Sequence, residues 1–99
     1  MEQKPQPRKL NVELGTEESE GIYSNLALIA NSPQEIVIDF ARIMPGREKA
    51  KVYSRIIMTP GHAKMLLKTL EDNIKNYENQ WGEIKVIGQE SKNIGFRQE

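Results

Sequence analysis

The most regular hydrophobic pattern of the chain lies between residues 59 and 82. Thr59 is a suitable N-cap, and Pro60 fits the first helical position because its missing N–H has no partner to lose there. Gly82 can adopt the left-handed conformation that ends a helix. Apolar residues recur between these signals at intervals of three and four, within an arc of about 100°: Ala63, Leu66, Leu67, Leu70, Ile74, Tyr77 and Trp81. The pattern predicts one long amphipathic helix whose apolar stripe covers a sheet.

Three strand-like runs precede this helix, at residues 23–31, 35–43 and 50–58, and the second of them is rich in β-branched residues. Ser32-Pro33 separates the first two, and Met44-Pro45-Gly46, which suits a type II turn, separates the second from the third. Such short connections favour antiparallel pairing, because parallel strands need long crossovers. We therefore predict an α+β fold, with a three- to four-stranded antiparallel meander followed by one helix.

Two weaker patterns flank these elements. Leu10, Val12 and Leu14 alternate with polar residues and predict a short additional strand, and Ile84, Val86 and Ile87 could add another after the helix. Residues 1–9 hold two prolines and no large apolar residue beyond Met1, so we expect a disordered arm there. The chain then divides into this arm, one domain over residues 10–88 and a flexible C-terminal tail over residues 89–99.

Both faces of the expected sheet are apolar. Ile36, Ile38 and Phe40 point one way along their strand, whereas Val37, Ala41 and Ile43 point the other way. In the next strand, the alternation of side chains places Val52, Ile56 and Met58 on one face and Tyr53 and Ile57 on the other. One helix can cover only one face, so we expect a second copy of the chain to cover the other, as a homodimer or larger assembly. The candidate interface consists of Val37, Ala41, Ile43, Tyr53 and Ile57. The alternative is that the N-terminal strand or the C-terminal segment folds over that face.

The composition restricts the function further. The 99 residues allow one small domain, and 14 basic residues balance 14 acidic ones. Without cysteine and with one histidine, one copy cannot assemble a zinc site or an iron–sulfur site. The longest apolar run, residues 26–30, is too short to span a membrane, and residues 1–9 do not resemble a signal peptide. We expect a soluble, cytoplasmic protein without a metal or cofactor.

Catalytic motifs are missing from the sequence. No serine lies in a G-x-S-x-G elbow, and neither a Walker loop nor a G-x-G-x-x-G motif occurs. His62 is the only histidine that could act as a base. The adjacent acids Glu71 and Asp72 lie on the polar side of the expected helix, so we expect them to be solvated charges rather than a general acid and base. We therefore expect a non-enzymatic protein.

Local charge offers one candidate binding site. The window from residue 42 to 68 contains seven basic residues and Glu48 as its only acid: Arg42, Arg47, Lys49, Lys51, Arg55, Lys64 and Lys68. It includes the helix start, where Gly61 and His62 lie near free backbone N–H groups that attract anions. Alternation places Tyr53 on the same face as Lys51 and Arg55, so a base could stack between phosphate-binding cations. The alternative is that the cations protect a sheet edge from aggregation, His62 is an ordinary surface residue and Tyr53 belongs to the oligomer interface.

The residues from Arg55 to Ile84 resemble the bacterial family DUF3467, a domain of unknown function. The resemblance rests on Arg55, Ile56, Ile57, Thr59, Pro60, His62, Ala63, Lys64, Asn73, Tyr77, Glu78, Gly82 and Ile84. Upstream, it extends to Tyr23, Asn25, Ser32, Pro33, Glu35, Asp39 and Phe40. The resemblance implies a short cytoplasmic protein and brings no activity or cofactor with it.

The expected order of elements is also similar to that of the protein-export chaperone SecB, in which paired sheets form oligomers and bind unfolded chains. Three hypotheses follow: a homo-oligomeric binding or scaffold protein, a nucleic-acid-binding protein, and a holdase chaperone. The expected partners are accordingly a second copy of the chain, nucleic acid or unfolded protein, and no membrane.

Overall fold

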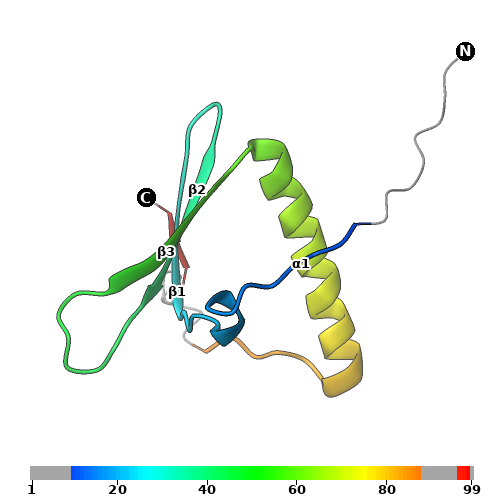
Figure 1. Cartoon of the computed structure of the whole chain (residues 1–99). Helices are drawn as coiled ribbons and strands as arrows, with labels where there is room; N and C mark the ends of the chain where they lie inside the picture. The colour runs from blue at the N-terminus through cyan, green and yellow to red at the C-terminus, as the bar shows by residue number, and fades with distance from the viewer. Residues whose placement is uncertain (1–9, 88–95, 99) are drawn as a thin grey trace, which may run out of the picture.

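The structure, a computed structural model, describes residues 10–87 and 96–98 of the chain (Figure 1). The described elements, in chain order, are the 3-10 helix η1 (Glu18–Glu20), the strands β1 (Leu26–Asn31), β2 (Ile36–Arg42) and β3 (Lys51–Met58), the helix α1 (Pro60–Trp81) and the strand β4 (Phe96–Gln98). The three antiparallel strands followed by one helix confirm the predicted α+β class.

Both predicted turns between the antiparallel strands are present. At the β1–β2 turn, the Ser32 N–H donates to the Glu35 carbonyl (2.9 Å), and the Ser32 hydroxyl accepts from the Glu35 N–H (3.2 Å). Before β3, the Arg47 N–H donates to the Met44 carbonyl (3.2 Å). Gly46 lies at the third position of this turn with φ +82°, which is the type II geometry that Pro45-Gly46 predicts.

The fourth strand of the sheet is not one that the sequence predicts. The strand order is β3-β2-β1-β4, and β4 pairs with β1 in the parallel direction, so the sheet is mixed rather than a pure meander. β4 lies within residues 89–99, for which we expected a flexible tail; residues 1–9, 88–95 and 99 are outside the described part.

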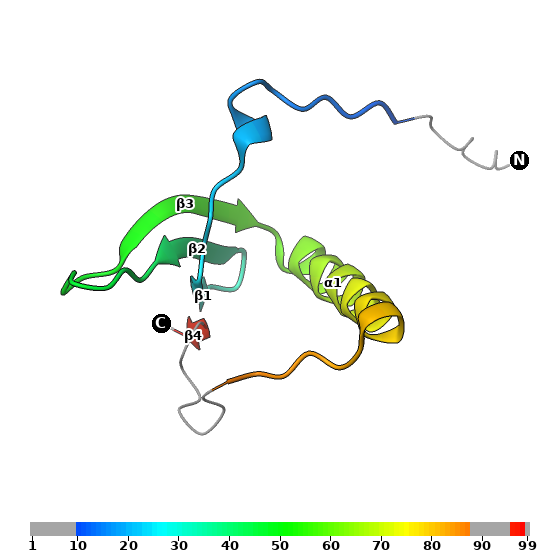
Figure 2. The same ribbon diagram turned by 90° about the horizontal axis from the view of Figure 1, so that it is seen from below.

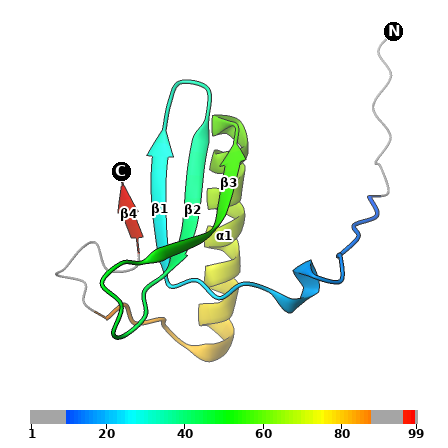
Figure 3. The same cartoon turned by 60° about the vertical axis from the view of Figure 1, so that its left-hand side comes forward.

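The two weaker strand predictions are wrong. Residues 10–14 form no strand, and Leu10, Val12 and Leu14 are exposed, since this segment runs away from the sheet (Figures 2 and 3). Residues 83–86 likewise form no strand. Alternating apolar residues make a strand only where a neighbouring edge can pair with them. Because the segment over residues 10–14 lies away from the sheet, it also does not cover a sheet face.

A β-bulge changes which face of the sheet some residues occupy. Phe40 pairs with Ser54, whereas Ala41 pairs with Val52, so Tyr53 is an extra residue without a partner on β2. Directly opposed residues share a face. Val52 therefore lies on the face of Ala41, and not with Ile56 and Met58 as simple alternation predicts.

The helix has the predicted bounds but does not pack on its own sheet. The Thr59 side chain accepts from the His62 N–H (3.2 Å), Pro60 occupies the first turn, and Gly82 follows the last residue with φ +103°. Figures 1 and 2 show α1 attached to β3 at one end and standing apart from the sheet, and Figure 3 shows it behind the sheet, running roughly along the strands. Extensive contacts among the described elements join strand to strand only.

The core within one copy is consequently small. The apolar residues that are buried among the described ones are Leu26, Ala27, Ile38 and Ala41, all of them on β1 and β2. No helical residue is buried. The prediction that the helix stripe is covered by the sheet is therefore wrong for a single copy of the chain.

Candidate functional site

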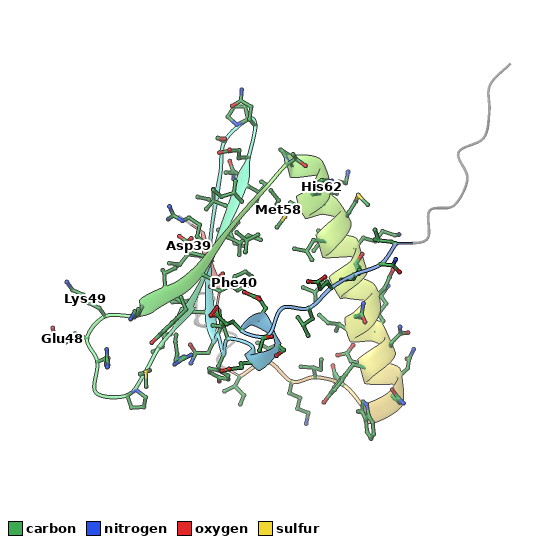
Figure 4. The ribbon with its side chains drawn as sticks, in the orientation of Figure 1. Asp39, Phe40, Glu48, Lys49, Met58 and His62 are labelled. Atoms are coloured by element: carbon green, nitrogen blue, oxygen red, sulfur yellow. The ribbon has the colours of Figure 1, made fainter. Side chains whose placement is uncertain are left out.

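Two apolar surfaces of the described chain face each other without packing together, one on the sheet and one on α1. We call the first the helix-side face: Ile29, Ile36, Ile38, Phe40, Ile56 and Met58, which share one side of the sheet by register. Figure 4 shows Phe40 and Met58 on the side of the sheet toward α1, and Asp39 on the other side. Ile38 is buried and Ile56 is exposed, while the other four are intermediate.

The second surface is the helix stripe, which consists of the seven residues predicted from periodicity, Ala63 to Trp81. Its large side chains range from 40% exposed at Ile74 to 71% exposed at Trp81. Water therefore reaches both surfaces. Together they exceed the scattered apolar exposure that is ordinary for a soluble protein.

The opposite side of the sheet, which we call the far face, carries part of the predicted oligomer interface. Val37 pairs with Ile57, and Ala41 pairs with Val52, so these residues share this face. Ala41 is fully buried, Val37 is intermediate and Ile57 is exposed. Two members of the predicted set do not join them: Ile43 lies beyond the end of β2, and Tyr53 is the unpaired residue of the bulge.

The far face also holds the one side-chain ion pair among the described residues. Asp39 and Arg55 are directly opposed on β2 and β3. The Arg55 Nε and Nη2 donate to the two carboxylate oxygens of Asp39, at 2.6 and 2.8 Å. The Asp39 side chain is 4% exposed and that of Arg55 is 63% exposed, so the guanidinium covers the carboxylate from the solvent side.

This pair has an electrostatic consequence for Asp39. The hydrogen bonds from Arg55 favour the ionised carboxylate and lower the pKa of Asp39, and the guanidinium charge acts in the same direction. Burial opposes this shift without reversing it. Arg55 therefore has a structural role in the sheet, and its predicted role in an anion site stays a prediction.

A basic-aromatic cluster forms at the end of the sheet next to the β2–β3 connection; it consists of Tyr23, Arg42, Lys51 and Tyr53. The Arg42 guanidinium carbon lies 4.3 Å from the centre of the Tyr53 ring and 6.0 Å from that of Tyr23. The Lys51 Nζ lies 5.1 Å from the centre of the Tyr53 ring. These are cation–π distances. The Arg42 Nε also donates to the Tyr23 carbonyl (3.3 Å), which orients the guanidinium.

The bulge explains why this cluster differs from the prediction. Tyr53 contacts Lys51 as expected, but its other cation is Arg42 rather than Arg55. Sequence alternation gave no sign of the extra residue on β3. The role of Tyr23 was missed as well, because its contact with Arg42 depends on how the chain enters β1.

The other residues of the predicted anion site fall into two groups at opposite ends of β3. Arg47 and Lys49 lie in the loop that precedes β3, whereas Gly61, His62 and Lys64 follow the other end of this strand. Eight residues of β3 separate the two groups, which corresponds to about 26 Å. Figure 4 shows Glu48 and Lys49 at one end of the sheet and His62 at the other. The predicted basic window is thus divided in two.

Two shallow hollows lie at the ends of the sheet. One, of about 520 Å³, is lined by Ile22, Ser24, Asn25, Leu26, Ala27 and Phe40. Its polar side chains already bind the backbone: the Ser24 hydroxyl donates to the Ala41 carbonyl (2.9 Å), and the Asn25 Oδ1 accepts from the Ile43 N–H (2.7 Å). The other, of about 380 Å³, is lined by Gln34, Glu35, Ile57, Met58, Thr59 and His62.

Neither hollow combines a nucleophile, a base and an orienting group within hydrogen-bond reach. Within residues 10–87 and 96–98, no three histidine or acidic side chains gather as metal ligands. In the same part of the chain, no helix is both long and apolar enough to cross a bilayer.

Comparison with known proteins gives a family and no activity. No curated protein and no solved structure matches the chain significantly, so the similarity to SecB has no support from a structural match. The family model described as "Protein of unknown function (DUF3467)" matches residues 1–86. This match spans most of the chain and includes the sheet and helix residues that carry the resemblance. The chain belongs to the DUF3467 family.

Proposed function

We propose that this chain is a non-enzymatic binding protein whose working form is a homo-oligomer. The observation that carries the proposal is the exposure of the helix stripe opposite a helix-side face that is also accessible to water. The four apolar side chains that are buried among the described residues are too few to offset the conformational entropy of ordering this part of the backbone. A second copy supplies the missing apolar contacts by symmetry.

Sedimentation velocity of the full chain tests this proposal directly. We expect a species of at least twice the 11.3 kDa chain mass at micromolar concentration. A single species of chain mass throughout the micromolar range would contradict the proposal.

The absence of an enzymatic function is part of the same proposal. The structure uses Asp39 for an ion pair, Ser24 and Asn25 for backbone contacts, and Thr59 for a helix cap. We place the protein in the cytoplasm, which its cysteine-free sequence permits.

A second candidate function is binding to the backbone of nucleic acid. It is supported by the basic-aromatic cluster, in which Arg42 and Lys51 both lie within cation–π distance of the Tyr53 ring, and by Arg47 and Lys49 in the adjacent loop. Cations contact phosphates, and an exposed tyrosine offers a stacking surface for a base. The site would lie at this end of the sheet alone, because the helix start lies at the other end of β3.

Anisotropy of a fluorescent single-stranded oligonucleotide tests this second function. We expect binding that weakens steeply between about 50 and 200 mM salt, and that is lost in the Lys49→Glu/Lys51→Glu double variant. The matched control is Lys75→Glu, a charge reversal on α1 away from the cluster. Equal binding by the double variant and the control would exclude this site.

A further inference from the structure

We infer that two copies of the chain exchange their helices, so that α1 of each copy packs on the helix-side face of the other copy's sheet. This inference rests on the proposed homo-oligomer and specifies how it is built. The helix-side face of each copy is thus covered by the helix stripe of the second copy.

The exposed area of a single copy is large enough for such an exchange. A compact protein of 11.3 kDa exposes about 5,700 Å², whereas this chain exposes 9738 Å². If residues 1–9 and 88–99 are assigned the surface of an unfolded chain, the largest they could expose, they account for about 3,500 Å² of the 9738 Å². More than about 1,000 Å² of excess surface then belongs to residues 10–87. A stable dimer buries about 800 Å² from each partner.

The helix is also long enough to cover the helix-side face. The helix has 22 residues and is about 33 Å long, and its stripe extends over most of this length. The strands β2 and β3 have seven and eight residues and are about 23 to 26 Å long. One helix therefore covers the helix-side face from end to end.

The connection between β3 and α1 explains why the helix does not close on its own sheet. Thr59 alone lies between Met58, the last residue of β3, and Pro60, the first of α1. Thr59 is held by two hydrogen bonds: its side chain accepts from the His62 N–H (3.2 Å), and its carbonyl accepts from the Ala63 N–H (3.0 Å). Pro60 fixes φ at the first helical position.

Because the connection consists of one N-cap residue followed by proline, the chain has little freedom to fold the helix back onto its own sheet. Figures 1 and 2 show the result, with α1 beside the sheet and apart from it. Short, constrained connections of this kind favour the exchange of an element between identical copies, because the same contacts form without bending the hinge. The helix of a second copy can approach the helix-side face without this restriction.

Cross-linking tests the inference, and the absence of cysteine makes each introduced thiol unique. Ser54→Cys is a conservative change on the helix-side face, opposite Phe40. Leu66→Cys, Leu70→Cys and Ile74→Cys place a thiol on successive turns of the stripe. The Ser54→Cys chain is unfolded and refolded together with each helix variant, which carries an affinity tag for identification, and treated with a short bismaleimide.

We expect covalent pairs of a tagged and an untagged chain for at least one helix position. The matched controls are Met65→Cys, on the opposite side of α1, and Ile57→Cys, on the far face of the sheet; neither should give such pairs. A chain that carries both Ser54→Cys and the reactive helix variant should cross-link into dimers rather than closing internally.

The outcomes separate the inference from the proposed function. Internal cross-links in an assembly of two or more chain masses would overturn helix exchange and leave the homo-oligomer in place. Mixed pairs that form equally with the Met65→Cys and Ile57→Cys controls would also overturn it. A monomer in sedimentation would overturn both the exchange and the proposed function.

Discussion

Shortening Leu70 to alanine probes the helix stripe at its middle. In a single copy, the Leu70 side chain is 53% exposed. If no partner covers the stripe, Leu70→Ala changes the free energy of unfolding by no more than about 0.5 kcal/mol, as is usual at surface positions. If the stripe is covered by a second copy, the same change removes a buried leucine, which costs about 2–5 kcal/mol.

A symmetric dimer contains this position twice. Because half of the side chain already lies against its own helix, we take the lower limit of the range, about 2 kcal/mol for each copy. Two copies then lose about 4 kcal/mol of association free energy, which raises the dimer Kd about a thousandfold.

Sedimentation over a dilution series measures this change. The control is Met65→Ala, which shortens another apolar side chain of the same helix; Met65 is 67% exposed and lies outside the stripe. We expect the Kd of the Met65→Ala variant to stay within a few-fold of the original. Equal association constants for the original chain and the Leu70→Ala variant would refute the claim that the stripe is an interface.

Three further predictions concern the stability of the fold. Arg55 lowers the pKa of Asp39 in the folded protein. The stabilisation from this carboxylate is therefore complete above the pKa of an unfolded aspartate, about 3.9, and is lost as the pH falls through the lower pKa of the folded state. Urea unfolding should show this acid-dependent loss in the original chain and not in an Asp39→Asn variant. Thr59→Ala removes the side-chain cap of α1 and should destabilise the protein by about 0.5–2 kcal/mol, measured by the same unfolding curves, whereas Thr59→Ser should retain most of the stability. Gly46→Ala should cost about 1–2 kcal/mol although its new Cβ would meet no atom within 4 Å, because φ is +82° there; an unchanged unfolding midpoint would show that this turn is not held in the type II geometry.

Local chemistry was sufficient to predict the turns and the helix. Pro45-Gly46 specifies its turn through the φ preferences of two adjacent residues, and Thr59 and Gly82 delimit α1 through groups within a few residues of the helix ends. The three long strands likewise follow from apolar runs of strand length that end at turn residues. All of these depend on interactions between near neighbours in the chain.

The candidate surfaces depend on contacts that sequence alternation does not contain. The extra residue at Tyr53 moves Val52 to the far face and brings Tyr53 to Arg42, and no periodicity indicates such a bulge. The sequence predicts the apolar positions of the helix stripe but not their packing partner. An apolar stripe indicates that some surface must cover it, but it does not indicate whether that surface belongs to the same chain or to another copy. The strand predicted over residues 10–14 failed for the same reason: Val12 lies in an alternating apolar pattern without a strand beside it.

If a second copy completes this fold, unfolding must depend on the protein concentration. Urea unfolding of the full chain is followed by circular dichroism at concentrations that differ a hundredfold. When folding and association are coupled, the midpoint rises with concentration, because dilution favours the separated, unfolded chains. We expect this rise. A midpoint that is the same at both concentrations would show that a single copy folds on its own, without a partner on the helix stripe.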